Sequence, residues 1–326
     1  RGRGSGSSRC RPRAMNRAGF GAGVAAALGA VLIWGLQIPI GKQVLAQIDG
    51  FSLGLLRYVV AMLGFVVLLV WKEGWPAVSP VGHVRVLSVA GGVGIAGSVF
   101  LVFAGLSLTR PESAAIIGAL QPAIAVIAQW WLERRQPERF TLGCVAVAFV
   151  GVLLVVTRGG EALSSQHHFT FDELLGNLLV FLGSIAWVTY SVSTRAISQW
   201  SSARISALTC MFGVAAATPI WFLAHALGGT YFPNQADGAL IGKVAFLAVF
   251  GALVAILLWN ISLRRIGTLN SVLLSNLTPV VAFIALAALG AELQASELLG
   301  AALVVGALVA NNLHQRRLSA GPAGPR

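Results

Sequence analysis

The sequence predicts an all-α integral membrane protein in which ten transmembrane helices form two inverted five-helix repeats. Of its 326 residues, 56% are hydrophobic and only 10% are charged, with a mean hydropathy of +0.80. The chain also repeats a residue pattern in its second half. Such a composition places most of the chain in hydrocarbon and excludes a water-soluble core.

Ten apolar segments are each long enough, at about 17–25 residues, to cross a bilayer. They lie near 18–41, 51–71, 84–108, 113–132, 141–157, 174–195, 204–226, 240–262, 268–289 and 296–314. The longest interruptions, 158–173 and 227–239, have the length and composition of loops. We therefore expect no catalytic domain outside the membrane.

The second half repeats features of the first that hydrophobicity alone does not require. The repeated groups are Leu120-x-Pro122-x2-Ala125 with Leu277-x-Pro279-x2-Ala282, 157 positions later, and Trp34 with Lys42, followed by Trp187 with Arg195, 153 positions later. These matches indicate an internal duplication. Because each half holds an odd number of spans, the second copy enters the membrane from the opposite face, and a pseudo-two-fold axis lies in the membrane plane.

This duplication sets the expected domain organisation. The first repeat covers 15–158, an outer linker loop 159–173, the second repeat 174–314, and a cytoplasmic tail 315–326. We interpret residues 1–14 as sequence upstream of a start at Met15, and the alternative is a disordered basic arm that touches anionic lipid.

The net charge of +12 is spread unevenly along the chain. If the N-terminus is inside, four of the 23 Lys and Arg residues fall in outer segments: Lys42, Arg110, Arg158 and Lys243. The positive-inside rule then predicts that both termini are cytoplasmic in a cell inner membrane. The basic charge is therefore explained by orientation and membrane lipid, and we expect no nucleic-acid partner.

Three cysteines offer neither a metal-ligand spacing nor a disulfide framework, and we expect no metal and no cofactor. The adjacent His167 and His168 leave a metal-binding loop open, but a solvated polar loop is the simpler interpretation. An integral-membrane enzyme would need paired acids or a Ser/His couple at membrane depth. The sequence places no such group there, so we expect no enzyme.

Pro122 and Pro279 fall near the middle of the fourth span of each half. Proline removes a backbone donor and breaks the helix, and broken helices mark binding sites in transporters. The prolines are expected to shape a cavity, with packing kinks as the alternative. Polar residues gather beside them: Gln121, Ser275, Asn276 and Thr278. Gln121, Ser275 and Asn276 are expected to contact substrate, although hydrogen bonding between helices remains an alternative.

In two places an aromatic residue lies three positions before a hydrogen-bonding one on the same helix face: Trp34 before Gln37 and Trp187 before Tyr190. An aromatic ring beside a hydrogen-bonding group suits a cavity wall, so we predict that all four bind substrate. Asn260, next to Trp259, is added to the predicted site, with an interfacial position as its alternative.

Arg57 is the ionisable side chain that lies well inside a span. It is a candidate counter-ion for an anionic substrate. The alternative is a structural role in which it snorkels outward and holds backbone carbonyls.

The order and repetition of these residues resemble the drug/metabolite transporter superfamily, in its ten-helix members with two EamA repeats. The residues that carry the resemblance are Trp34 to Lys42, Arg57, Leu120-x-Pro122, Glu133-Arg134, Gly143 and Gly151, with their echoes Trp187 to Arg195, Leu277-x-Pro279, Glu292, Gly300 and Gly306. The echo departs at Glu292, which lies two positions late. The resemblance implies an inverted-repeat bundle around a central cavity and export or exchange of metabolites.

We therefore expect a secondary transporter that exports or exchanges small polar metabolites such as amino acids by alternating access. Exchange of sugar phosphates, nucleotide sugars or purines is the alternative within the same fold. A non-transporting assembly protein or a channel is the alternative of another class. The expected partners are a small-molecule substrate and membrane lipid, and a homodimer is left open.

Overall fold

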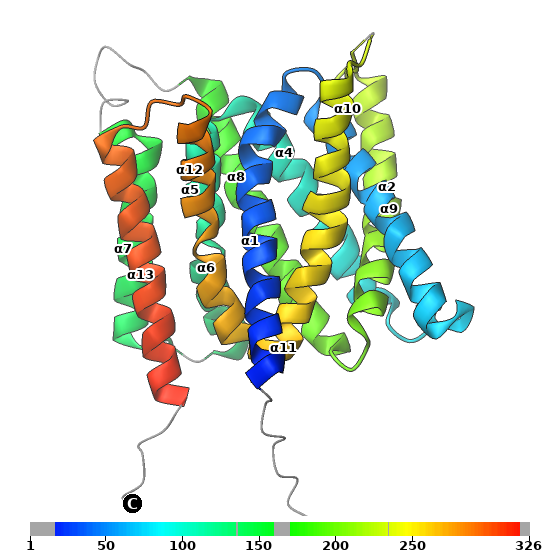
Figure 1. The fold of residues 1–326 in the computed structure, drawn as a ribbon, viewed down its shortest axis with the longest axis horizontal. Coiled ribbons are helices and arrows are strands. Elements are labelled where there is room, and N and C mark those ends of the chain that lie inside the picture. The colour runs from blue at the N-terminus through cyan, green and yellow to red at the C-terminus, as the bar shows by residue number, and fades with distance from the viewer. Residues whose placement is uncertain (1–16, 135, 160–169, 234, 320–326) are drawn as a thin grey trace, which may run out of the picture.

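The computed structural model describes residues 17–134, 136–159, 170–233 and 235–319. Every regular element among these residues is helical, and the helices stand side by side across one slab (Figure 1). Nine of the helices described are long and apolar enough to cross a membrane. The predicted class, an all-helical membrane protein, is confirmed.

Helices of the first half alternate in direction across the slab (Figure 1). They are α1 (Arg17–Leu45), α2 (Gly50–Glu73), the 3-10 turn η1 (Trp75–Val78), α3 (Val84–Leu87), the π-helical η2 (Ser88–Gly97), α4 (Ser98–Leu108), α5 (Pro111–Ala119), α6 (Gln121–Glu133) and α7 (Arg139–Val156).

The second half repeats the π-helical third span and the broken fourth span, but its 3-10 turn follows the first helix instead of the second. It contains α8 (Phe171–Ser193), the 3-10 turn η4 (Thr194–Ile197), α9 (Ser202–Ala226), α10 (Gly238–Ala245), the π-helical η5 (Phe246–Val254), α11 (Ala255–Ser275), α12 (Thr278–Ala288) and α13 (Ala295–Ser319).

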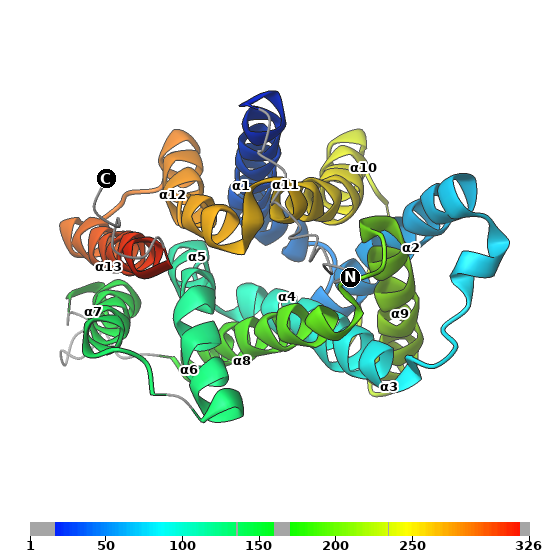
Figure 2. The same cartoon turned by 90° about the horizontal axis from the view of Figure 1, so that it is seen from below.

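Contacts between helices follow the duplication. The first helix of each repeat packs on the third span of the other, α1 on α11 and α8 on α4. Two further pairs join equivalent helices, α2 with α9 and α7 with α13. Figure 2 shows α4, α8 and α9 facing α1, α11 and α12. The two halves therefore interlock, and the space between them is shared by both.

The fourth span of each half is broken where the prolines predict. In the first half α5 ends at Ala119 and α6 begins at Gln121, and Leu120 N donates to Ile117 O at 3.0 Å in a tightened turn. In the second half the break falls between Ser275 and Thr278. The predicted span 268–289 is therefore crossed in two pieces, the last turns of α11 beyond a kink at Gly267 and the eleven residues of α12.

Side-chain caps fix where several helices begin. Asp49 accepts from the backbone N–H of Ser52 ahead of α2, and Ser201 accepts from that of Arg204 ahead of α9. A short polar side chain at this position satisfies a backbone donor that the helix leaves free. The second span of each half therefore starts from the same kind of cap.

Helix pairs approach closely where both contribute glycine. A Cβ added to Gly105 of α4 would lie 2.6 Å from the carbonyl oxygen of Gly176 in α8. In the same way, a Cβ on Gly151 of α7 would lie 2.6 Å from the carbonyl oxygen of Gly300 in α13. Small residues allow helices to pack without an intervening side chain, which is a main source of association in lipid.

The third span of each half contains a π-helical segment, η2 in the first and η5 in the second. They begin at Ser88 and Phe246 and so occupy equivalent positions of the two repeats. The sequence did not reveal these segments. Because π-helical turns are rare and often accompany function, their duplication directs attention to the helices that carry them.

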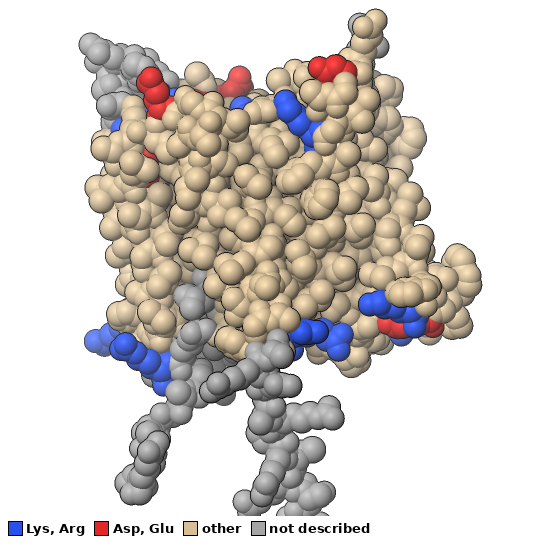
Figure 3. Space-filling view, viewed as in Figure 1, with Lys and Arg blue, Asp and Glu red and all other residues tan. Residues whose placement is uncertain are grey.

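Both described ends of the chain lie on one face of the slab, which we call the terminal face (Figure 1). The opposite face, which carries the turn between α1 and α2, is called the far face. Lys and Arg gather along the terminal face, whereas most visible Asp and Glu lie on the far face (Figure 3).

Candidate functional site

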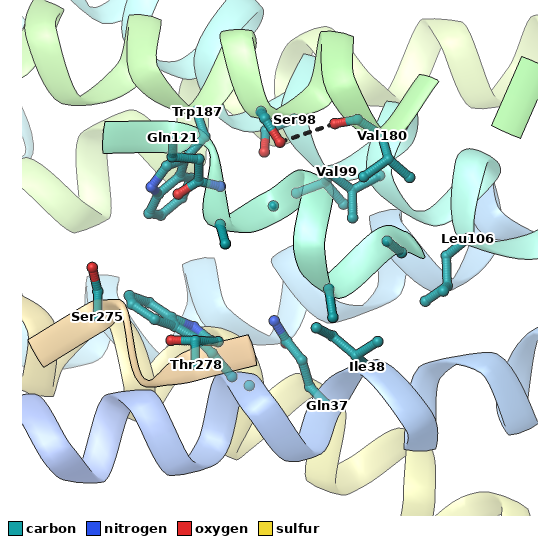
Figure 4. Close-up of a pocket in the computed structure, with 18 of the residues that line it drawn as sticks. Gln37, Ile38, Ser98, Val99, Leu106, Gln121, Val180, Trp187, Ser275 and Thr278 are labelled. Atoms are coloured by element: carbon teal, nitrogen blue, oxygen red, sulfur yellow. Dashed lines mark hydrogen bonds between the residues drawn. The ribbon is translucent and has the colours of Figure 1, made fainter. Parts of the chain in front are cut away.

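A cavity of about 200 Å³ lies between the two halves. Nine of the predicted site residues line it: Trp34, Gln37, Arg57, Gln121, Pro122, Trp187, Ser275, Asn276 and Pro279. Figure 4 shows Gln121 and Trp187 on one side, with Ser275 and Thr278 of the broken span on the other. Residues from 34 to 279 thus meet in one place.

Three indole rings form one wall of the cavity. Trp34 and Trp187 meet edge to face with ring centroids 6.1 Å apart, and Trp34 lies 5.5 Å from Trp259 in a tilted arrangement. All three residues line the cavity. Aromatic pairs of this geometry are favourable beyond the area that they bury, so the wall is held in a defined shape.

Arg57 lies in the cavity wall and is only 3% exposed. Its Nε donates to the carbonyl oxygen of Leu247 at 2.9 Å, and its Nη2 donates to Oε1 of Gln37 at 2.8 Å. The guanidinium carbon sits 4.4 Å from the centroid of the Phe103 ring. Arg57 therefore holds a backbone carbonyl, as its structural interpretation predicts, but it remains inside the protein and does not reach outward.

The charge of Arg57 is not neutralised within the cavity. The residues that line it include no Asp, Glu, Lys or second Arg. Its two hydrogen bonds and the Phe103 ring stabilise the buried cation, but no anion among these residues balances its charge. The cavity therefore presents a positive site to which an anionic group would be attracted.

Gly251 of η5 makes room for the Arg57 group. A Cβ at this position would lie 2.9 Å from Oε1 of Gln37 and 3.1 Å from Nη2 of Arg57. The π-helical segment that contains it also supplies the Leu247 carbonyl. The irregular segment thus both admits and anchors the buried cation.

Asn276 lies at the break between α11 and α12 and is 2% exposed. Its Nδ2 has no hydrogen-bond partner among the described residues, although it borders the cavity. An unpaired buried amide donor costs free energy, about 1–3 kcal/mol, that a ligand acceptor could recover. The broken helix therefore places a free donor at the cavity.

Two predicted site residues are not among the residues that line the cavity. Tyr190 is buried behind Trp187, with ring centroids 5.1 Å apart, and it packs against Gly94 of η2. Asn260 donates through Nδ2 to Oγ of Ser206 at 3.0 Å and so ties α11 to α9. Their positions suit support of the wall rather than direct contact.

The structure adds lining residues that the sequence prediction omitted, among them Tyr58, Ser98, Ser184 and Gly251. Ser184 carries a detectable signal, because an isolated hydroxyl three residues before Trp187 falls on the same helix face. Its Oγ donates to the Val180 carbonyl at 3.0 Å, which satisfies it within the helix. Gly251 had no such signal, since its role depends on side chains from α1 and α2.

Within the described part of the chain, no group of three or more His, Cys, Asp or Glu residues could hold a metal ion. His167 and His168, which left a metal-binding loop open, lie outside the described residues.

An all-helical membrane fold of two repeats, with a cavity at their junction that combines aromatic walls and a few polar groups, is the architecture of a membrane transporter. The EamA-like transporter family matches residues 21–157 and 174–313. The chain belongs to this family, and it is a multi-pass membrane transporter rather than an enzyme.

Relatives of similar length are also described as transporters. The uncharacterized transporter YrdR of Bacillus subtilis (strain 168) is 26% identical over 90% of this chain and 92% of its own. The uncharacterized transporter YyaM of the same organism is 28% identical over 88% of this chain and 92% of its own. One solved crystal structure covers 91% of this chain and 99% of its own at 22% identity with a TM-score of 0.64, which shows a common fold.

Proposed function

We propose that this transporter moves small metabolites bearing a carboxylate, such as amino acids, by alternating access through the central cavity. The repeats 15–158 and 174–314 supply equivalent halves, and exchange of their conformations would open the cavity first to one face and then to the other. The substrate would bind among Trp34, Trp187 and the Arg57–Gln37 pair, with Asn276 as a further donor.

The observation that carries this proposal is a buried cation that has no anionic partner among the residues that line the cavity. Arg57 is the one charged side chain among the residues that line the cavity. A guanidinium binds carboxylates strongly through charge-assisted hydrogen bonds. The indole wall and the uncharged polar groups would accept the rest of a zwitterionic or polar molecule.

The size of the cavity supports a small substrate. Its volume of about 200 Å³ is below the ~300–1,000 Å³ of sites for drug-sized ligands. An amino acid or a similar metabolite is therefore favoured over a nucleotide sugar. Sugar phosphates, which are also anionic, remain the competing class that the test must separate.

For orientation, we propose that the terminal face is cytoplasmic and that the protein resides in the cell inner membrane. The basic side chains gathered on this face support the assignment (Figure 3). Export from the cytoplasm is the proposed direction.

The test is substrate counterflow with purified protein in proteoliposomes. Vesicles preloaded with pools of amino acids, sugar phosphates, nucleotide sugars or purines are given a labelled member of the same pool, at two pH values. Saturable uptake that depends on preloaded amino acids, and that is lost for their amides, is expected. Uptake with sugar phosphates instead would reassign the substrate. Uptake that does not depend on preloading would contradict a carrier and indicate a channel.

A further inference from the structure

At the far face, a lysine from one helix holds the end of another. Lys42 of α1 donates through Nζ to the carbonyl oxygens of Leu106 at 2.8 Å, Ser107 at 3.0 Å and Thr109 at 2.6 Å. The last carbonyls of a helix have no partner within it and carry partial negative charge. Lys42 thus binds the C-terminal end of α4 with three charge-assisted hydrogen bonds.

The same segment is tied to other helices. We call residues Leu106–Arg110, which join α4 to α5, the far-face corner. Thr109 donates through Oγ1 to Oδ1 of Asn177 in α8 at 2.6 Å. Arg110 forms an ion pair with the buried Glu297 of α13 and donates to the Val155 carbonyl of α7 at 3.1 Å. The far-face corner is therefore held by α1, α7, α8 and α13 together.

The duplication places an equivalent corner at the terminal face. Adding the repeat offset of 157 to Leu106–Arg110 gives Leu263–Gly267, the terminal-face corner, where α11 bends. The equivalent of Lys42 is Arg195, eight residues after Trp187. Among the described residues Arg195 is exposed and makes no side-chain hydrogen bond or ion pair. It lies in the 3-10 turn η4, beyond the end of α8.

Hydrogen bonds at the terminal-face corner are local. Asn270 donates through Nδ2 to the Ile266 carbonyl oxygen, and Ser271 Oγ lies 3.0 Å from the Gly267 carbonyl oxygen. Ser262 and Ser271 share a hydrogen bond between their hydroxyls at 2.6 Å. Among the described residues, no side chain of another helix bonds this corner as Lys42 bonds its counterpart. The two repeats therefore differ at equivalent places, one corner held and the other released.

We propose that Lys42 and Arg195 are alternating latches, each closing one face of the transporter by binding the helix end at its own corner. This inference rests on the proposed function, because alternating access requires the two repeats to exchange conformations. The structure corresponds to the state in which the far face is latched. In the opposite state Arg195 donates to the carbonyls of Leu263, Arg264 and Ile266, where it takes the place of Asn270 at the Ile266 carbonyl, and Lys42 is released.

Electrostatics explains why both latches are cations. The partner is a set of backbone carbonyls, so a side chain with several donors and a positive charge complements it. A neutral side chain at a latch position leaves those carbonyls unpaired in the latched state, which raises its free energy. The free energy of the released state is unchanged. A neutral replacement of Lys42 should therefore shift the population toward the state in which the far face is open.

The test measures distances between spin labels across each face. On a background free of native cysteines, Gln47→Cys with Asp172→Cys, both exposed, reports the far face, and Gln199→Cys with Arg264→Cys reports the terminal face. Lys42→Met is expected to raise the ratio of long to short far-face distances about tenfold or more, and to shorten the terminal-face distances. Lys42→Arg, which keeps a charged donor, should retain the parent distribution.

Arg195→Met is the reciprocal variant. It should leave the parent's far-face distances short and reduce whatever far-open population the parent has. Unchanged distributions in a folded Lys42→Met protein would overturn the latch. If that variant does not fold, Asn177→Leu, which removes a separate tie to the far-face corner, must shift the distances in the same direction, and no shift would overturn the proposal. The spin-label distances are measured without substrate. If the variants shift them as expected but counterflow fails, only the proposed substrate is contradicted, not the latch.

Discussion

The indole rings of Trp34 and Trp187, which occupy equivalent positions in the two repeats, meet edge to face with centroids 6.1 Å apart. Each ring comes from the first helix of its repeat, so the contact joins the two halves at the cavity itself. The duplication has thus produced two equivalent tryptophans that contact each other. The cavity wall is therefore sensitive to the relative position of the two halves.

This contact predicts a coupling between two single substitutions. Trp34→Ala and Trp187→Ala should each raise the KM of counterflow, because each removes part of the same wall. The double variant should raise KM by less than the product of the two single effects. The difference, expressed as a coupling free energy, should be about 0.5–1.5 kcal/mol, the value typical of aromatic pairs. Strict additivity of the two effects in log KM would show that the rings act independently.

Arg57→Gln should weaken binding of substrates that carry a carboxylate. Loss of a hydrogen bond to a charged group corresponds to about 1.5–3 kcal/mol, or roughly 10–150-fold in affinity. The measurement is the KM for the acid compared with that for its amide, in protein of unchanged melting temperature. Lys72→Gln is the matched control, because it removes a positive charge in the last turn of α2, at the terminal face and outside the cavity. An equal effect on the acid and the amide would argue against carboxylate recognition.

Replacement by alanine should have opposite effects at Asn276 and Asn260, on KM at the first and on stability at the second. Asn276→Ala removes a donor that has no protein partner, so stability should be unchanged or slightly raised while KM rises. Asn260→Ala breaks a hydrogen bond to Ser206, so stability should fall by about 1 kcal/mol, with little effect on KM. Thermal unfolding and counterflow, measured side by side, separate the two roles. A stability loss in Asn276→Ala would point to packing instead of binding.

Tyr231, in the loop between α9 and α10, predicts an alkaline sensitivity of the far face. Its hydroxyl donates to the Leu45 carbonyl at 2.8 Å, and its backbone N–H donates to Oδ2 of Asp49 at 3.0 Å. Burial, together with the negative charge of Asp49, raises the pKa of the Tyr231 phenol above its ordinary value. The folded state therefore favours the neutral phenol, and this stability is present below the ordinary tyrosine pKa near ~10 and is lost as pH rises above it.

Tyr231→Phe should remove that part of the pH dependence. The measurement is the melting temperature from neutral to strongly alkaline pH, with Tyr190→Phe as the control tyrosine inside the bundle. The variant is expected to be less stable than the parent at neutral pH, and the difference should narrow at alkaline pH. Parallel curves for parent and variant would show that this phenol does not contribute.

Much of the fold was predictable because each prediction depended on local chemistry. Apolar length required membrane spans, and an odd number of spans in each duplicate required inversion. A proline in mid-span, repeated in both halves, favoured a break, and the breaks at Leu120 and Asn276 lie within three residues of Pro122 and Pro279. Proline alone is not sufficient, because Pro39 and Pro219 lie inside continuous helices. These conclusions need no knowledge of which helices touch.

The cavity lining was predictable only in part. Trp187 and Tyr190 share one helix face, yet Trp187 lines the cavity while Tyr190 packs against Gly94. Helical periodicity identifies residues on a common face but not the element opposite each one. The packing of the neighbouring helix at each depth decides which residue borders the cavity and which is covered.

By itself, the sequence determined the membrane class, the ten apolar segments, the inverted duplication and most of the residue types that line the cavity. Only the tertiary structure decided that Arg57 pairs with Leu247, 190 positions away, that two π-helical segments occupy matching places, and that Lys42 holds a helix end while Arg195 does not. The physical reason is that hydrophobicity and proline act along one helix. Hydrogen bonds between distant segments, and differences between two equivalent halves, depend on how helices pack.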